Sequence, residues 1–455
     1  MIETEILVVG GGPAGVISAI TAVKQGRKVI LVDSKSYQEI GNKVCGDALN
    51  LEPIKFLEKN LGITSPMENE VADSVERAIF KSHNVSFPLS GDGYVLNRHP
   101  YGQRLLKIAK ELGVEIKDNT KVIRALYDDF SVRGAVIIEK EGERISSEIH
   151  AKITIDCSGR NFIIRKTLPE RLFPFLEKHL EKRDIAATYR EIILLENQDH
   201  PYHNEIYLIY DENIPEPGYF WIFTKGEKKL NVGIGWYMDS KSERGMKELF
   251  REVLNKYYPE GTYKVLDKGG GQIPTRYPLT NAIVPGFLTA GDAALHVNPF
   301  TAEGHGPALI AGYYAGEIAA MAVETDKYHS EEFLWQYNKK IMHHFGLSHT
   351  KIQLFTEALK KIKVSGLEFL IRRSILSKDQ FINIHAGKKL GVLEMVKIAI
   401  KAFPRYDILL TIAKVSRSTQ KFEKIFSNYP NTPDSYPNWK EEFDIEMNKF
   451  RIKYI

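Results

Sequence analysis

The sequence predicts an α/β fold, α+β overall, in which a Rossmann-like domain is divided around an inserted antiparallel sheet and followed by a helical region. Three observations predict this class: a short buried strand that runs into a glycine-rich turn near the N-terminus, alternating strands between residues 186 and 276, and helical periodicity from Ala308 onward. The expected division of the chain is residues 1–170 and 277–330 for the two parts of the Rossmann-like domain, 171–276 for the sheet domain and 331–455 for the helical region.

The first element is a strand, a tight turn and a helix start. Residues 6–9 are apolar and mostly β-branched, as in a strand that is buried on both faces. The turn that follows has G-x-G-x-x-G spacing and comprises Gly10, Gly12, Pro13, Ala14 and Gly15. Such a turn lets the backbone approach a pyrophosphate, which binds at the helix start. Asp33 ends the next strand, residues 28–32, and is placed to accept hydrogen bonds from a ribose without a 2′-phosphate. These residues predict a dinucleotide site.

A second segment of the same domain lies almost three hundred residues later. A buried strand, residues 287–290, leads into the turn Gly291-Asp292-Ala293-Ala294, and a helix begins near Gly304 and His305. In this position Asp292 would face the ribityl hydroxyls or the pyrophosphate of a flavin. Together with the first turn and the strand end at residues 156–159, this segment predicts a flavoprotein that binds FAD.

The residues between these segments alternate between helices and strands. A helix is expected at residues 51–60, short strands at 75–95, a helix at 101–112, and strands at 114–116, 135–139 and 153–155. The inserted sheet is expected from four strands separated by turn signals, at residues 187–195, 205–210, 219–225 and 231–237.

Composition excludes several classes of protein. With 26% charged residues and ordinary hydrophobic content, the 455-residue chain predicts a globular protein with a large core. Two cysteines give no disulfide framework, which indicates a cytoplasmic location. No run of eighteen apolar residues predicts a membrane span, and the first strand leaves no room for a signal peptide. Residues 331–455 carry 22 Lys and Arg against 13 Asp and Glu, but they lack the interleaved aromatic residues of a nucleic-acid platform. No nucleic-acid partner is therefore expected.

The motifs together resemble the FAD-dependent family that includes aromatic hydroxylases and geranylgeranyl reductases. The resemblance rests on the first turn, on Arg98 before a helix, and on residues 156–159 and 291–293. Two further segments resemble archaeal geranylgeranyl reductases: Lys43-Val44-Cys45-Gly46-Asp47-Ala48, and the strand Gly218 to Gly226 with its Tyr-x-Trp-x-Phe pattern. The resemblance covers residues 1–330 and is weaker in the helical tail.

The resemblance also implies roles for individual residues. It implies that Tyr219 and Trp221 line a prenyl pocket, although their alternation on one strand face also fits an ordinary sheet core. Thr224 replaces the usual proline of that strand, which puts the substrate in question more than the cofactor. The residues implied to contact FAD, mostly through the backbone, are Ala14, Asp33, Cys45, Gly46, Ala48, Arg98, Val122, Asp292, Gly304 and His305.

The chemistry of the implied reaction needs a proton donor. An isolated alkene has no carbonyl to polarise, so its reduction takes a hydride from flavin N5 at one carbon and a proton at the other. Cys45 is the expected donor, because an ordinary cysteine thiol is mostly protonated at neutral pH. The alternative is that Cys45 is a small residue packed under the flavin. Cys157 is expected to serve packing alone.

The predicted function is therefore an FAD-dependent reductase of geranylgeranyl chains in prenyl diphosphates or archaeal ether-lipid precursors. Two alternatives stay open: a flavin monooxygenase or halogenase of the same fold, and a non-catalytic flavoprotein that binds prenyl lipid or carries electrons. The electron donor, NAD(P)H or ferredoxin, is undecided. No metal is expected, because the spacing of His343, His344 and His349 does not place them on one helical face.

The helical tail carries amphipathic basic stretches. One combines Leu367, Leu370, Ile371 and Ile375 with basic residues at 372, 373 and 378, and the other spans residues 396–402. These stretches suggest peripheral contact with a membrane, from which a lipid substrate would be drawn. A helix face packed on the rest of the protein has the same pattern.

Overall fold

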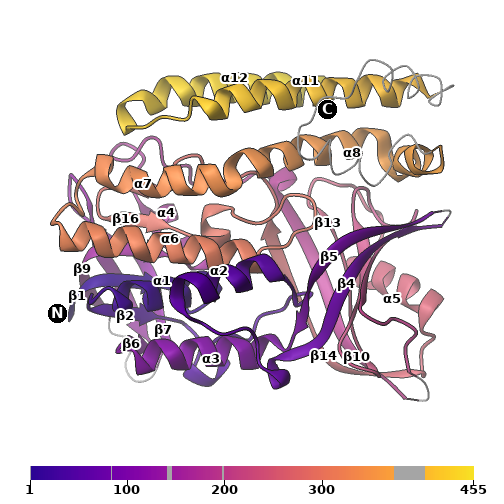
Figure 1. Cartoon of the computed structure of the whole chain (residues 1–455), viewed down its shortest axis with the longest axis horizontal. Coiled ribbons are helices and arrows are strands. Elements are labelled where there is room, and N and C mark those ends of the chain that lie inside the picture. Colours follow the sequence, from indigo (N-terminus) through magenta and orange to yellow (C-terminus); the bar gives the residue numbers. More distant parts are fainter. Residues whose placement is uncertain (1, 84, 141–145, 197–198, 374–404, 455) are drawn as a thin grey trace.

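The computed structural model describes residues 2–83, 85–140, 146–196, 199–373 and 405–454. Within these residues the strands form two eight-stranded sheets, which stand side by side with helices packed around and above them (Figure 1). The first sheet belongs to the Rossmann-like domain and the second carries the inserted strands. The fold class predicted from the sequence is confirmed.

The first sheet is built around β1 (Ile2–Val9), which pairs in parallel with β2 (Val29–Val32) on one side and with β9 (Ser146–Asp156) on the other. Residues 6–9 and 29–32 are buried, as their apolar sequence predicts. The strand order is β15-β16-β9-β1-β2-β6, and β8 joins β7 to β9. The remaining strands of this sheet are β6 (Glu115–Lys117), β7 (Thr120–Tyr127), β8 (Val132–Glu139), β15 (Ile283–Val284) and β16 (Phe287–Thr289).

Two helices join the distant halves of this domain. Helix α1 (Pro13–Lys24) lies beside α6 (His305–Glu324) (Figure 1). A Cβ on Gly312 would lie 2.4 Å from the carbonyl oxygen of Ala14, and one on Gly316 would lie 2.4 Å from that of Ser18. The Ser18 hydroxyl is 3.0 Å from the carbonyl oxygen of Gly312 and donates to it. The two backbones are therefore in direct contact.

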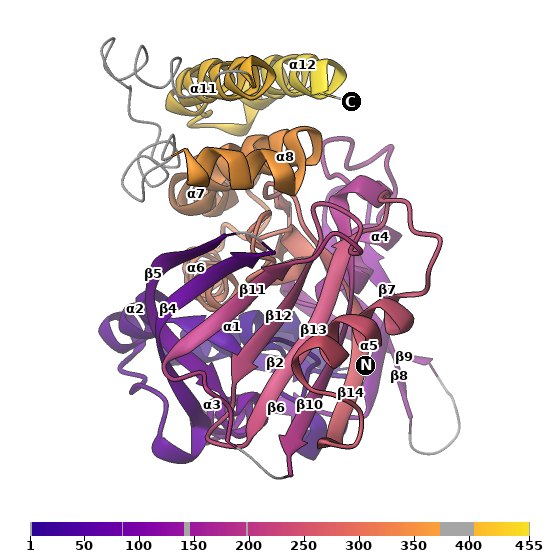
Figure 2. The same cartoon turned by 90° about the vertical axis from the view of Figure 1, so that its right-hand side faces the viewer.

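The second sheet has the order β14-β10-β13-β12-β11-β4-β5-β3, which Figure 2 shows from β5 to β14. The predicted strands are present, and β14 is an additional edge strand. Three strands, β3, β4 and β5, come from residues assigned above to the Rossmann-like domain, and β4 pairs with β11 in parallel. The sheet is thus larger than predicted and not wholly antiparallel. Its strands are β3 (Ala48–Asn50), β4 (Val71–Ser82), β5 (Ser86–Leu96), β10 (Ile185–Leu195), β11 (Glu205–Tyr210), β12 (Tyr219–Thr224), β13 (Lys229–Tyr237) and β14 (Tyr263–Pro274).

Each face of the second sheet has its own partner. One face packs on α5 (Met246–Tyr257) in a core that includes Tyr189 and Phe250. The other face turns toward the Rossmann-like domain and, at its far end, toward helix α8 (Leu347–Arg372). The domain boundaries given above stay a prediction. The other helices below the tail are α2 (Leu51–Leu61), α3 (Arg98–Glu111) and α4 (Ile163–Thr167).

The helical region forms two layers above the sheets (Figure 2). Helices α7 (Glu331–Ile341) and α8 (Leu347–Arg372) are joined by a π-helical turn, and α11 (Tyr406–Ser427) and α12 (Tyr436–Tyr454) lie over them. Leu367 and Leu370 of the first amphipathic stretch are buried against the second sheet, whereas Ile375, residue 378 and residues 396–402 lie outside the described residues. No helix in the described part of the chain is long and apolar enough to cross a bilayer.

The contact between α1 and α6 gives a first prediction. Gly312→Val should force the helices apart and lower the free energy of unfolding by about 2–3 kcal/mol, as overpacking does. FAD, the cofactor that the sequence predicts, should be lost with it. Gly245→Ala is the control, because a Cβ there meets no described atom within 4 Å. Thermal unfolding and flavin absorbance measure both effects, and a Gly312→Val protein with normal stability and flavin content would contradict the prediction.

Candidate active site

A cavity of about 420 Å³ lies between the two sheets. Its walls come from the turn after β1, from residues 43–50, from residues 290–308, and from strands β10, β11, β12 and β14 of the second sheet. The segments singled out in the sequence therefore meet at one place. The predicted site residues that line this cavity are Gly12, Pro13, Ala14, Cys45, Gly46, Ala48, Arg98, Tyr219, Trp221, Asp292, Gly304 and His305.

Four predicted residues do not line the cavity. Gly10 and Gly15 form the inner side of the turn, where a Cβ on Gly15 would lie 1.8 Å from the carbonyl oxygen of Gly10. Asp33 lies behind the turn. Val122, on β7, is buried in a core cluster with residues of β1 and β2. A contact of Val122 with FAD through its backbone stays a prediction.

The turn after β1 has the geometry that a dinucleotide needs. Gly10 has φ +103°, and a Cβ there would lie 2.5 Å from the carbonyl oxygen of Cys157, so only glycine fits. At Gly12 a Cβ would meet no described atom within 4 Å, which leaves the approach to the helix open. No described side chain caps the first turn of α1. The free amides at its start, together with the positive end of the helix dipole, fit a pyrophosphate.

Asp33 is tied to that turn. One carboxylate oxygen accepts from the amide of Gly11 at 2.7 Å, and the other accepts from the amide of Lys35 at 2.8 Å. The side chain is only partly buried. It is thereby held at the end of β2, where the fold predicts a ribose.

A cluster of charges lies at the flavin end of the cavity. Lys43 and Asp292 form an ion pair at 2.8 Å. Burial raises the pKa of Asp292, but Lys43 and Arg98 lower it further, so that it lies below its ordinary value. Burial lowers the pKa of Arg98, whereas Cys45, Asp47 and Asp292 raise it, and the net shift is upward. Arg98 therefore stays a cation, and it lines the cavity together with Cys45.

The loop that carries Cys45 is held from the second sheet. The Asn231 amide donates to the carbonyl oxygen of Cys45 at 2.7 Å and to Asp47 at 3.1 Å. Lys225 donates to the same carboxylate of Asp47 at 3.0 Å, and all three of these polar side chains are buried. The Trp221 indole donates to the Asn231 oxygen at 3.1 Å. Nothing in the sequence singles out Asn231 or Lys225, because their partners are almost two hundred residues away.

Aromatic side chains of β12 form the apolar wall. Tyr219, Trp221 and Phe223 alternate on one strand face, with ring centroids 6.2 Å and 6.3 Å apart, and the Tyr219 hydroxyl donates to the carbonyl oxygen of Thr301 at 2.8 Å. All three line the cavity. Thr224, in place of the expected proline, is buried on the opposite side and pairs with Leu230 of β13.

Glu303 is a cavity residue that the sequence did not reveal. Its carboxylate accepts from the amide of Gly306 at 2.7 Å, in the first turn of α6. Burial raises its pKa from 4.5 to about 7, an effect that Asp292 reinforces and that Arg98 and the backbone amides only partly offset. Burial and Arg98 hold the pKa of the adjacent His305 well below its ordinary value, so that imidazole is neutral. The only feature of the sequence that points to Glu303 is its position directly before Gly304, the glycine at the start of helix α6.

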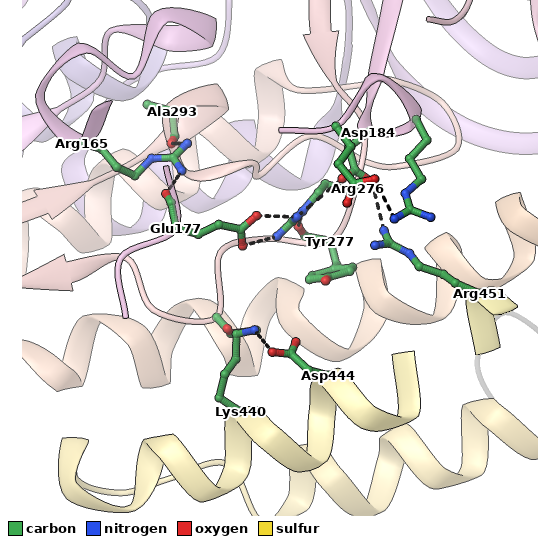
Figure 3. A network of polar contacts seen from close by, with 12 residues as sticks. Arg165, Glu177, Asp184, Arg276, Tyr277, Ala293, Lys440, Asp444 and Arg451 are labelled. Carbon is green, nitrogen blue, oxygen red and sulfur yellow. Dashed lines mark hydrogen bonds and ion pairs between the residues drawn. The ribbon is translucent and has the colours of Figure 1, made fainter. Parts of the chain in front are cut away.

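A buried ionic network supports the turn at residues 291–294 from behind (Figure 3). Arg165 donates to the carbonyl oxygen of Ala293 at 3.0 Å and to the backbone of Glu177. Arg276 binds the Glu177 carboxylate through two hydrogen bonds of 2.7 Å. Asp184 links Arg276 to Arg451 of α12, at 3.6 Å and 3.0 Å. The network connects the C-terminal helix to the turn.

These features define the class of the protein. The glycine turn, the anchored Asp33 and the uncapped start of α1 fit FAD, and a family model described as FAD dependent oxidoreductase matches residues 5–165. The chain is an FAD-dependent oxidoreductase. A second model, the geranylgeranyl reductase catalytic domain, matches residues 184–273, which hold the aromatic wall.

The relatives narrow the class to a family. A digeranylgeranylglycerophospholipid reductase of Sulfolobus acidocaldarius is 30% identical over 99% of this chain and 98% of its own. Digeranylgeranylglycerophospholipid reductase 2 of Methanopyrus kandleri is 32% identical over 90% of this chain and 99% of its own. The chain therefore belongs to the archaeal geranylgeranyl reductase family, which confirms the resemblance seen in the sequence, and it is a reductase of C=C bonds.

Solved structures show the same fold. A geranylgeranyl bacteriochlorophyll reductase-like protein of Thermoplasma acidophilum aligns with a TM-score of 0.72 at 21% identity, over 91% of this chain and 100% of its own. The flavin-dependent brominase Bmp2 aligns with a TM-score of 0.64 at 16% identity, over 89% of this chain and 99% of its own.

The raised pKa of Glu303 gives a second prediction. A carboxyl whose pKa is higher in the folded than in the unfolded state stabilises the fold fully below pH 4.5, and that stability is lost as the pH rises to about 7. The flavin-free protein should therefore lose on the order of 2 kcal/mol more stability between pH 5 and pH 8 than the variant Glu303→Gln. Denaturant unfolding at both pH values measures the difference, in which the other titrating groups cancel. Equal pH dependence in the two proteins would show that Glu303 has an ordinary pKa.

Proposed function

We propose that the protein saturates isolated C=C bonds of geranylgeranyl chains carried by a prenyl diphosphate or an ether-lipid precursor. The observation that carries the proposal is the position of the Cys45 side chain, which lines the same cavity as Trp221 and the Arg98 guanidinium. The names of the relatives, which are digeranylgeranylglycerophospholipid reductases, support the same substrate class.

The residues of the cavity would contribute in three ways. Bound FAD, once reduced, supplies the hydride. Cys45 holds the proton that the second alkene carbon takes up, and the hydrogen bond from Asn231 to its carbonyl oxygen keeps its loop in position. Tyr219, Trp221 and Phe223 exclude water and present aromatic faces to the positive charge that develops on the alkene.

The test of this function is anaerobic incubation of the dithionite-reduced protein with geranylgeranyl diphosphate and with a digeranylgeranyl glycerol phosphate. Dithionite removes the need for NAD(P)H or ferredoxin, so the unknown electron donor does not limit the result. Each reduced bond adds two hydrogens to the product mass. Unchanged substrate masses would contradict the proposal.

The halogenase or monooxygenase alternative keeps some support from the shared fold of the brominase. A halogenase or monooxygenase would consume oxygen in proportion to the substrate converted. A reductase does not need oxygen, so removing oxygen should leave its rate of prenyl reduction unchanged or increase it. The same pair of assays detects a non-catalytic prenyl-binding flavoprotein, which would show neither reaction. Peripheral membrane contact stays a prediction, and flotation with anionic vesicles at low salt tests it.

The role of Cys45 gives the third prediction. Cys45→Ala should lower alkene reduction by about 100-fold or more, the usual contribution of a positioned general acid, without loss of bound FAD. Cys157→Ala is the matched control, since Cys157 is buried beside Ser18 and is expected to serve packing alone. Product formation under single-turnover conditions measures the effect. Full activity in Cys45→Ala would leave Cys45 as a packing residue.

A further inference from the structure

Arg190 is a buried cation in the cavity wall that the proposed reaction does not use. It lies in the middle of β10, is 4% exposed and lines the cavity. One guanidinium nitrogen pairs with Asp267 at 2.6 Å. Its Nε is buried and has no hydrogen-bond partner among the described residues. A buried guanidinium with an unused donor that faces a cavity can bind a further anion.

Arg190 has no side chain directly opposite it on either neighbouring strand. The residues directly opposite it on the two neighbouring strands are both glycines, Gly233 on β13 and Gly269 on β14. A Cβ on Gly233 would strike the Trp221 ring, and one on Gly269 would strike the Val44 side chain. Trp221 and Val44 therefore cover the glycines on either side of Arg190.

The same row of residues continues across the sheet as an apolar track. From Arg190 it runs through Gly233 and Trp221 to Leu208 and Phe80, each directly opposite the one before. Four strand spacings of ~4.8 Å make this track about 19 Å long. Trp221 and Leu208 line the cavity, whereas Phe80 lies in a core cluster with residues of α8 and closes the far end of the track. The track therefore has a cation at one end and hydrocarbon at the other.

The Cys45 loop runs along this track. The Val44 side chain lies over Gly269, the Cys45 carbonyl oxygen binds Asn231, and Gly46 lies against the Phe223 ring. Asn231 and Phe223 are opposite each other in the next row of the sheet. A chain that lay along the track with its head at Arg190 would therefore pass beside Cys45.

The end of the track at Arg190 lies close to solvent. Strand β14 is the edge of the sheet, and the Asp267 side chain is 55% exposed. Beyond Arg190 along the strands, a Cβ on Gly271 would meet no described atom within 4 Å, although Gly271 lines the cavity. A head group larger than a hydroxyl would thus find open space there.

We propose that Arg190 binds the phosphate group of a phosphorylated prenyl substrate, and that Asp267 is the counter-ion which this phosphate displaces. The inference rests on the proposed function and narrows it: the enzyme selects phosphate esters over free prenyl alcohols. A guanidinium suits the task because its planar donors match phosphate oxygens. Diphosphates and glycerol phosphates share this chemistry, and the test separates them.

The test compares KM for geranylgeranyl diphosphate, digeranylgeranyl glycerol phosphate and geranylgeraniol, all with dithionite-reduced protein. Arg190→Gln should raise KM for the phosphorylated substrates by about 10- to 100-fold and leave that for the alcohol unchanged. An effect confined to one phosphorylated substrate identifies the source of the phosphate. Asp267→Asn should lower KM for the phosphorylated substrates by about threefold or more, because the competing carboxylate is removed. Lys268→Gln, which removes an exposed neighbouring cation, is the control and should change nothing.

Each possible result either supports or overturns phosphate binding by Arg190. A similar rise in KM for all three substrates in Arg190→Gln would overturn the inference and make Arg190 a structural residue. If Arg190→Gln does not fold, Asp267→Asn decides alone, and unchanged KM values overturn the inference. If the parent protein reduces no prenyl substrate, the proposed function fails. Calorimetric titration with geranylgeranyl thiodiphosphate then still tests the phosphate site, since binding that Asp267→Asn strengthens supports it and absent binding overturns it.

Discussion

The direct contact between helices α1 and α6 is the constraint on which the rest of the structure depends. The first turn of α1 is to hold the pyrophosphate, and the segment that leads into α6 supplies Asp292, Glu303 and His305. These groups meet only because Gly312 lets the carbonyl of Ala14 approach within van der Waals contact. A larger residue there would push the two helices apart and displace these groups from one another. The core of the Rossmann-like domain is therefore also the frame of the cavity.

Hydrogen bonds and ion pairs connect the second sheet to the cavity loops. Asn231 and Lys225 of the second sheet bind the Cys45 loop, and the ionic network at Arg276 binds the turn at residues 291–294 through Arg165. A buried charged group with an ion-pair partner is costly to move, because its displacement leaves the partner unpaired. These contacts therefore hold the Cys45 loop and the turn at residues 291–294 in fixed positions on the cavity wall.

The sequence was informative where the chemistry is local. The glycine turn and Asp33 lie within a single strand-turn-helix-strand unit, so their spacing is a local signal. The alternation of Tyr219 and Trp221 predicts that both lie on one strand face, and that face lines the cavity. Distant pairing could not be predicted. The bond from Asn231 to Cys45 spans 186 residues, and the parallel pairing of β4 with β11 brings residues 71–82 into a sheet that the local pattern assigned elsewhere. The raised pKa of Glu303 depends on burial, which no local pattern reveals.

Charged side chains are distributed unevenly along the cavity. One end therefore suits a charged flavin cofactor, and another part suits an apolar prenyl chain. At the flavin end, Arg98 and Lys43 lie close to Asp292, Asp47 and Glu303, so positive and negative side chains nearly balance. The negative charge of a bound dinucleotide would lie elsewhere, at the start of helix α1. Trp221 and its neighbour across the sheet, Leu208, give the next part of the cavity wall an apolar surface. This uncharged surface fits the prenyl chain of the substrate proposed above. The pairing of Arg190 with Asp267 at the solvent edge keeps its charge both neutralised and remote from the buried part of the track.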